Sequence, residues 1–322
     1  MTNYINPVVV QRADPFIYKH SDGYYYFSAS VPEYDRIELR RAKTINGLAH
    51  ATPRTIWKKH ETPGIMDNLI WAPEIHWIDG VWYIYFEAES TVFNSNGGAD
   101  HPHRMFCISS DLENPMDFSG WVEKGQIETP IDSFSLDETV FELNGNLMMV
   151  WAQKDPAIEG SSNLYIAQMK NPWTIGSEPV MISTPTFDWE KRRFAVNEGP
   201  AVIVKNGMVF ITYSASATDE NYCVGMLYAK DSSDLLNADS WTKLDHPVFK
   251  SNPENHQYGP GHNSFTKSED GRQDLIVYHC RDYKDIDGDP LYDPNRHTMV
   301  QPFTWDQNGF PVFGKPVSNN YD

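Results

Sequence analysis

The chain has 322 residues, of which 40% are apolar and 13% aromatic, and its formal net charge at pH 7 is −18. Such an acidic chain is a poor partner for nucleic acid or an anionic membrane, because both require clustered positive charge. Its three cysteines are widely spaced and odd in number, which argues against a disulfide framework and a cysteine-type zinc site.

The N-terminal stretch MTNYINPVVVQRADPF has no basic region followed by an apolar segment of signal-peptide length. No run of residues approaches the 18 apolar positions of a membrane span. These features predict a cytoplasmic protein without a membrane partner. They leave the oligomeric state open, including a homo-oligomer.

The first predicted hairpin turns at Asp22-Gly23, directly before the aromatic strand YYYFSAS. Four further Asx-Gly pairs follow, each before an apolar strand: Asp79-Gly80, Asn144-Gly145, Asn206-Gly207 and Asp270-Gly271. The steps between them are 57, 65, 62 and 64 residues, which is a repeat with room for four antiparallel strands per unit. We therefore predict an all-β fold, a five-bladed β-propeller in which residues 1–322 form one domain. An ordinary sandwich with similar hairpins is the alternative.

The segment 295–314, NRHTMVQPFTWDQNGFPVFG, contains another strand-turn-strand pattern after the fifth unit. We expect it to complete the ring by pairing with the N-terminal segment.

The repeat also predicts which residues share a position in the ring. About eight residues before each turn lie the starts of the five innermost strands: Asp14, Trp71, Asp137, Glu198 and His262. Innermost strands of a propeller run along its axis, so these residues should converge on one mouth of the central channel.

Three of the five residues, Asp14, Asp137 and Glu198, are acids. Carboxylates held close together disfavour being charged at the same time, so their pKa values separate. Cleavage of a glycosidic bond requires such a pair, one carboxyl group protonated and the other ionised. The alternative is that each acid only caps the start of its strand.

Other candidates have two or three readings each. Trp71 is either a stacking platform for a sugar ring or part of the rim packing. His262 either ligates a metal ion in the channel or hydrogen-bonds to a carboxylate. Arg296 either holds a substrate hydroxyl, sets the charge of a nearby acid or forms a surface ion pair, and Arg281 leaves the same choice.

Weaker signals do not support other chemistry. Residues 284–293 resemble a calcium loop, but the glycine is at the fourth position and Arg296 stands where the loop's final Glu belongs. The sequence has no G-x-S-x-G elbow, no H-E-x-x-H and no glycine-rich phosphate loop.

The stretches RADPFI, WAPEIHWIDGVWYIYF, SLDETVFELNG, VNEGPAVIVKNG and YGPGHNSF together resemble the blade motifs of glycoside hydrolase family 43. YSASATDENYCVG and GDPLYDPNRHTMVQPFTW are similar to its arabinofuranosidase branch. The resemblance covers nearly the whole chain. It implies a five-bladed propeller that hydrolyses glycosides by single displacement, with inversion at the anomeric carbon.

By this resemblance Asp14 is the general base that activates water, and Glu198 is the general acid that protonates the leaving oxygen. Asp137 is the third acid, which orients Glu198 and raises its pKa by like-charge repulsion. Asp132 lies near Asp137 in the sequence, but the motif LDETVF fits Asp137 better.

The resemblance also assigns the pocket. Trp71 and Ala72 would line the site of the terminal sugar, and Arg296 would contact that sugar. His262 would match a channel histidine that in many members ligates calcium or another ion, although the chemistry requires no cofactor.

The expected activity is that of an exo-acting α-L-arabinofuranosidase on arabino-oligosaccharides, with α-1,5 linkages. β-Xylosidase and endo-arabinanase remain alternatives within the family, and a non-catalytic sugar-binding propeller is the alternative from another class. Linkage preference should depend on two loops, residues 30–36 and 93–103.

Overall fold

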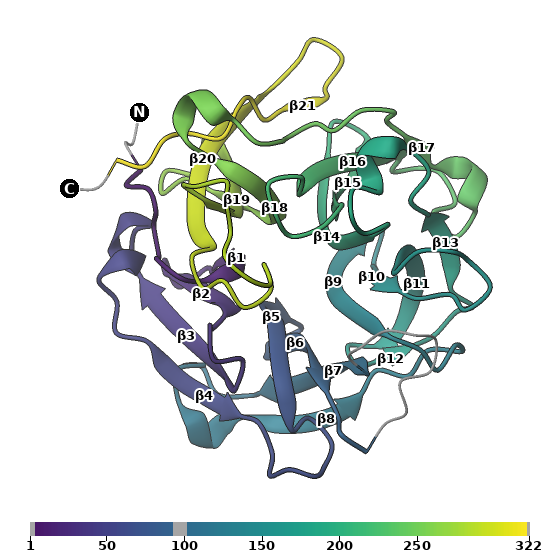
Figure 1. The fold of residues 1–322 in the computed structure, drawn as a ribbon. Helices are drawn as coiled ribbons and strands as arrows, with labels where there is room; N and C mark the ends of the chain where they lie inside the picture. Colours follow the sequence, from purple (N-terminus) through teal and green to yellow (C-terminus); the bar gives the residue numbers. More distant parts are fainter. Residues whose placement is uncertain (1–3, 93–101, 321–322) are drawn as a thin grey trace.

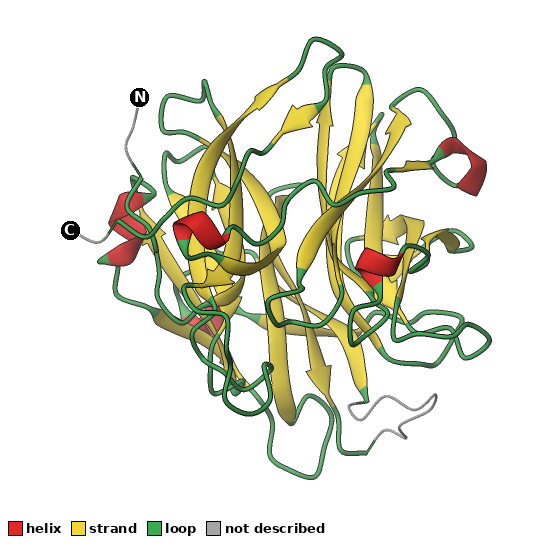
Figure 2. Ribbon diagram, turned by 45° about the horizontal axis from the view of Figure 1, so that its top comes forward, coloured by secondary structure: helices red, strands yellow, loops and turns green. Residues whose placement is uncertain are grey.

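The computed structural model describes residues 4–92 and 102–320, and it arranges five antiparallel sheets in a ring (Figure 1). The predicted all-β, five-bladed β-propeller is therefore confirmed. Helical structure among the described residues is limited to short 3₁₀ turns in the connections (Figure 2), and none is long and apolar enough to cross a membrane. These turns are η1 (Asn46–Ala49), η2 (Phe118–Gly120), η3 (Asp188–Glu190), η4 (Ala238–Ser240) and η5 (Pro253–Asn255).

Each blade is built from consecutive strands of the chain, with the first strand innermost. The third blade has an extra strand, β13, which pairs with β11. The first and second blades consist of β1 (Ala13–Lys19), β2 (Tyr25–Ser30), β3 (Arg36–Ala42), β4 (Arg54–Lys58), β5 (Asn68–Ile78), β6 (Val81–Glu89), β7 (His103–Ser110) and β8 (Val122–Gln126). The third blade consists of β9 (Ser135–Leu143), β10 (Asn146–Gln153), β11 (Asn163–Asn171), β12 (Thr174–Ile175) and β13 (Val180–Ser183). The fourth consists of β14 (Asn197–Lys205), β15 (Met208–Ala215), β16 (Cys223–Lys230) and β17 (Thr242–Lys243). The fifth consists of β18 (Tyr258–Lys267), β19 (Asp274–Arg281), β20 (His297–Trp305) and β21 (Pro311–Val312).

The five Asx-Gly pairs occupy the first hairpin of each blade, as the repeat predicts. At Asp79-Gly80, Asn144-Gly145 and Asn206-Gly207 both residues have positive φ, the geometry of a type I′ turn. Such turns match the twist of the flanking strands. The sequence repeat thus marks the point where each innermost strand reverses direction.

The hydrophobic core is divided into five clusters, one between each pair of neighbouring blades. Between the first two blades, for example, Tyr26 and Ile37 pack with Trp82 and Phe86, all at most 1% exposed. Large aromatic side chains bury much apolar area per residue, which explains the aromatic content of the chain. The blades are held in place by these interfaces.

The two ends of the chain close the ring together. The N–H of Val8 donates to the carbonyl of Thr298 in β20 (2.8 Å), and Asn6 exchanges hydrogen bonds with Val300 of the same strand. The segment 295–314 supplies the third and fourth strands of the fifth blade, so the expected pairing with the N-terminal segment is confirmed.

Candidate active site

Every innermost strand is interrupted near its start by a residue with positive φ, at which the pairing with the second strand shifts register. These residues are Asp14 (φ 54°), Ala72 (37°), Asp137 (57°), Gly199 (52°) and His262 (39°). Bulges of this kind bend a strand and redirect its side chains, and they are common at functional sites. The predicted register was therefore wrong by one residue in two blades, because Trp71 and Glu198 directly precede the bulged position. The turn spacing cannot reveal where a strand bulges.

Asp14 is buried and surrounded by hydrogen-bond donors and positive charge. Its Oδ2 accepts from the Ser30 hydroxyl (2.6 Å), and its Oδ1 lies 3.4 Å from Nη1 of Arg296 and 3.3 Å from Nδ1 of His262. Burial alone would raise the pKa of Asp14, but the charges of Arg296 and His262 hold it well below its usual range. Asp14 is consequently ionised at any pH at which the fold is expected to persist.

His279 holds the backbone of Asp14. The N–H of Asp14 donates to Nδ1 of His279 (3.0 Å), which requires that nitrogen to be unprotonated. Burial lowers the pKa of His279 to about 3, despite the opposing effect of Asp14. A neutral imidazole therefore faces the carboxylate, and Arg296 is the group that balances its charge.

Glu198 is half-buried at the start of β14 and has the opposite pKa shift. The pKa of Glu198 is raised to about 7, mainly by burial and also by the charge of Asp14, against the lowering effects of Tyr222 and Arg296. The Tyr222 hydroxyl donates to Oε1 of Glu198 (2.8 Å). Near neutral pH this carboxyl group can hold a proton while Asp14 remains charged.

Asp137 lies between the two blades that contain Glu198 and Glu87. Its Oδ2 accepts from the N–H of Gly199 (2.8 Å), and its own N–H donates to Oε2 of Glu87 (3.2 Å). Burial raises the pKa of Asp137 well above its usual value, with further contributions from the charges of Glu87 and Glu198. The cause predicted for the high pKa of Glu198 was repulsion by Asp137. In the structure the causes are burial first and the charge of Asp14.

Arg296 is 5% exposed, so the reading as a surface ion pair is wrong. One nitrogen faces Asp14, and the other donates to the Tyr34 hydroxyl (2.8 Å), which in turn donates to the carbonyl of Leu291 (2.6 Å). These contacts support the reading in which Arg296 sets the charge state of a nearby acid.

Trp71 and Ala72 lie beside Asp14, in the second blade. The Trp71 ring stacks on His103, with ring centroids 3.8 Å apart, and meets Tyr34 edge-on. The N–H of Ala72 donates to the Ser30 hydroxyl (2.8 Å), the same hydroxyl that donates to Asp14. Both residues are thus near Asp14, and Trp71 has packing contacts whether or not it also stacks on a sugar.

His262 completes the ring and lies next to Asp14. Its N–H donates to the Ser214 hydroxyl (2.7 Å), and its Nδ1 faces Asp14. Within residues 4–92 and 102–320, no group of three or more His, Cys, Asp or Glu side chains is arranged to hold a metal ion. The closest charged neighbour of His262 is therefore the Asp14 carboxylate, at 3.3 Å, and an ion held by this histidine stays a prediction.

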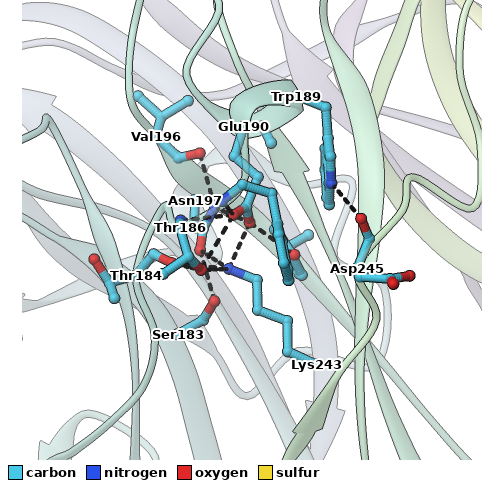
Figure 3. Close-up of polar contacts among 12 residues, drawn as sticks. Ser183, Thr184, Thr186, Trp189, Glu190, Val196, Asn197, Lys243 and Asp245 are labelled. Carbon is cyan, nitrogen blue, oxygen red and sulfur yellow. Dashed lines mark hydrogen bonds and ion pairs between the residues drawn. The ribbon is translucent and has the colours of Figure 1, made fainter.

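A buried ion pair anchors the strand that contains Glu198 (Figure 3). Glu190 is fully buried, pairs with Lys243 (2.5 Å) and accepts from Nδ2 of Asn197 (2.9 Å) and from the Tyr213 hydroxyl (2.9 Å). Asn197 directly precedes Glu198, so this network fixes the backbone from which the proposed proton donor projects.

Two further residues from the sequence analysis, Arg281 and Asp132, lie outside the cluster of acids. Arg281 is buried and donates to the carbonyls of Thr218 and Pro290 (both 2.7 Å). The second bond stabilises the position of the loop 284–293. Asp132 is an exposed partner of Arg104 (2.6 Å), which agrees with discounting it. Of the two loops expected to set linkage preference, residues 93–101 lie outside the described residues.

Sequence reasoning missed four residues that contact the acids or their backbone, Ser30, Glu87, Tyr222 and His279, and also Tyr34, which holds Arg296. Three of these residues lie on the second strand of a blade, eight or nine positions after the Asp of the preceding Asp-Gly turn: Ser30, Glu87 and His279. The same repeat, counted forward from the turn, would have identified them.

Comparison with known proteins places this geometry in a family. Residues 4–311 match the family model described as glycosyl hydrolases family 43. An "Extracellular exo-alpha-(1->5)-L-arabinofuranosidase" of Streptomyces avermitilis is 58% identical over 98% of this chain. The chain belongs to glycosyl hydrolases family 43. The predicted family and its class, the glycoside hydrolases, are therefore confirmed.

Other members of family 43 extend the comparison. A crystal structure of the α-L-arabinofuranosidase from Lactobacillus brevis is 62% identical, with a TM-score of 0.97 over 99% of this chain and 98% of that one. A second "Extracellular exo-alpha-(1->5)-L-arabinofuranosidase", from Streptomyces chartreusis, is 47% identical over 89% of this chain and 85% of its own length. The chain spans only 64% of the length of the Streptomyces avermitilis relative.

The expected cytoplasmic location is contradicted by this comparison. Both Streptomyces relatives are named as extracellular enzymes. The prediction was based on an N-terminal stretch without a signal peptide, and that feature is not a reliable guide to location.

Proposed function

We propose that this member of family 43 is an inverting, exo-acting α-L-arabinofuranosidase that releases terminal arabinofuranose from α-1,5-linked arabino-oligosaccharides. The names of two relatives and of one solved structure support the sugar, and the Streptomyces names support the linkage and the exo action. We infer from the same names that it acts outside the cell.

The observation that carries the proposal is the opposite pKa shift of two carboxyl groups at one mouth of the channel. Asp14 is held ionised beside Arg296, and the pKa of Glu198 is raised to about 7. An inverting glycosidase needs a charged base and a protonated acid on opposite faces of the sugar, with space for one water.

In this mechanism Asp14 accepts a proton from a water molecule, which attacks the anomeric carbon. Glu198 donates its proton to the leaving glycosidic oxygen as the bond breaks. Asp137, held against the N–H of Gly199, lies beside the donor and keeps its backbone in position. Arg296 stabilises the ionised form of Asp14 before the reaction.

The test compares Glu198→Gln with the unmodified chain on arabinotriose, 4-nitrophenyl α-L-arabinofuranoside and 4-nitrophenyl β-D-xyloside. The unmodified chain should prefer the two arabinosides, and NMR of the first product should show an inverted anomer. Glu198→Gln should lose arabinotriose hydrolysis by about 10²-fold or more, and Asp14→Ala should be inactive on all three.

Each contrary outcome removes a definite part of the proposal. Preference for the xyloside would indicate a β-xylosidase, and internal cleavage of long arabinan would indicate an endo-arabinanase. Binding without hydrolysis would indicate a sugar-binding module, and retained anomeric configuration would exclude Asp14 as a base acting on water.

A further inference from the structure

The N–H groups of the five bulged residues follow a pattern around the ring. In four cases the N–H donates to a side chain on the second strand of the preceding blade. The pairs are Ala72 to Ser30 (2.8 Å), Asp137 to Glu87 (3.2 Å), His262 to Ser214 (2.7 Å) and Asp14 to His279 (3.0 Å). Four of the five pairs of neighbouring blades are thus connected by this hydrogen bond, at the starts of their innermost strands.

The four acceptors occupy one register position. Ser30, Glu87, Ser214 and His279 each pair with the residue directly before a bulge. In the third blade the residue in this register is Ala152, which pairs with Leu136. Among these five described positions, Ala152 alone has no side-chain acceptor.

The fourth bulged residue, Gly199, therefore takes a different partner. Its N–H donates to Oδ2 of Asp137, which belongs to the innermost strand of the third blade and not to the second. A buried N–H without a partner is costly, so the absence of an acceptor at Ala152 makes this N–H available to Asp137. Asp137 is thereby brought against the residue that follows Glu198.

We propose that Ala152 is a positioning residue for the reaction: by lacking an acceptor it directs the Gly199 N–H to Asp137, which places this carboxyl group beside the proton donor. This inference rests on the proposed function, because it gives Glu198 the role of general acid. Glu87 supports the arrangement from the other side, since its Oε2 accepts from the N–H of Asp137.

The test substitutes Ala152→Ser, which restores the hydroxyl that Ser30 and Ser214 supply in two other blades. The new hydroxyl should accept from the Gly199 N–H and release Asp137. The leaving group of arabinotriose is poor, so its departure depends on protonation by Glu198. The dinitrophenolate of 2,4-dinitrophenyl α-L-arabinofuranoside is a good leaving group and departs without that proton. We expect kcat for arabinotriose to fall about tenfold or more, and kcat for the dinitrophenyl substrate to change less than about twofold.

Three variants serve as controls. Ala167→Ser buries the same hydroxyl in the neighbouring strand β11, within the apolar cluster between the second and third blades, and should leave the ratio of the two kcat values unchanged. Ala152→Gly also lacks an acceptor and should retain the unmodified ratio even if it lowers stability. In an Asp137→Asn background, Ala152→Ser should have little further effect on the ratio.

The outcomes separate this inference from the proposed function. If Glu198→Gln fails to discriminate between the two substrates, the acid assignment is wrong whatever Ala152→Ser does. If Glu198→Gln discriminates and Ala152→Ser behaves like Ala167→Ser, the positioning role of Ala152 is refuted alone. A changed ratio in Ala152→Gly would refute it equally, and that variant decides the question if the serine variant does not fold.

Discussion

Replacing Tyr222 by Phe should move the alkaline limb of the pH–rate profile upward. The Tyr222 hydroxyl donates to Oε1 of Glu198 (2.8 Å) and favours the ionised carboxylate, so it lowers the pKa of Glu198. Phenylalanine removes the donor and retains the ring, which stacks on His279 with centroids 5.7 Å apart. The proton on Glu198 should therefore be held to higher pH.

The size of the effect follows from the strength of this bond. A hydrogen bond to a charged group contributes about 1.5–3 kcal/mol, and about 1.36 kcal/mol corresponds to one pH unit. The pKa of Glu198 is about 7 in the unmodified chain. The alkaline midpoint of kcat/KM should accordingly lie near 7 and should rise by about one to two pH units in Tyr222→Phe.

The assay is kcat/KM for arabinotriose from pH 4 to 10, which reports the ionisations of the free enzyme. Tyr278→Phe is the matched control, because the Tyr278 hydroxyl is equally buried but donates to Gln301 (2.8 Å). That variant should keep the original midpoint. An unchanged or lowered midpoint in Tyr222→Phe would show that this hydroxyl does not control the proposed proton donor.

Three further predictions concern charge. Arg296→Met should raise the pKa of both Asp14 and Glu198, since Arg296 lowers both. The profile of kcat/KM against pH should then gain an acidic limb, and its alkaline midpoint should rise. A profile without either change would contradict the role of Arg296. Glu190→Gln removes the charged partner of Lys243 and should lower the free energy of unfolding by about 2–4 kcal/mol in urea titrations. Adding Lys243→Met should recover part of this loss. Equal stability of the unmodified chain, the single variant and the double variant would argue against the anchoring ion pair. The pKa of Glu198 is about 7 in the folded chain and 4.5 without the fold. The free energy of unfolding should therefore fall as the pH rises from 4.5 through about 7, because the unfolded chain loses this proton first. Glu198→Gln should therefore gain about 2–3 kcal/mol over the unmodified chain between pH 5 and pH 8, and a stability difference independent of pH would refute this linkage.

The fold could be predicted because its signal is local and repeated. An Asx-Gly pair followed by an apolar strand recurs five times, and three of these turns adopt the geometry that only such residues favour. Counting back from the turns located the three acids on the innermost strands. It was in error by one residue at Trp71 and Glu198, because a bulge adds a residue without changing the residue types nearby.

The interactions that set the pKa values could not be predicted in this way. His279 is far from Asp14 in the sequence, and only closure of the ring brings its Nδ1 against the N–H of Asp14. The pKa of Glu198 depends mainly on burial, which is a property of the assembled channel mouth and not of the motif NEGP. The positions of the three acids were accessible from the pattern, whereas their electrostatic environment required the three-dimensional structure.

The closure of the ring by both chain ends has a topological consequence. Asn320 donates through its N–H to the carbonyl of Asn6 (2.7 Å) and through Nδ2 to that of Tyr4 (3.1 Å), and Figure 1 shows the first and last described segments, in purple and yellow, close together at the outer rim. A short covalent linker could therefore join them, and the chain could be opened instead at an exposed loop between blades. Such a circular permutant would keep every blade intact and would move both termini to a chosen position around the ring.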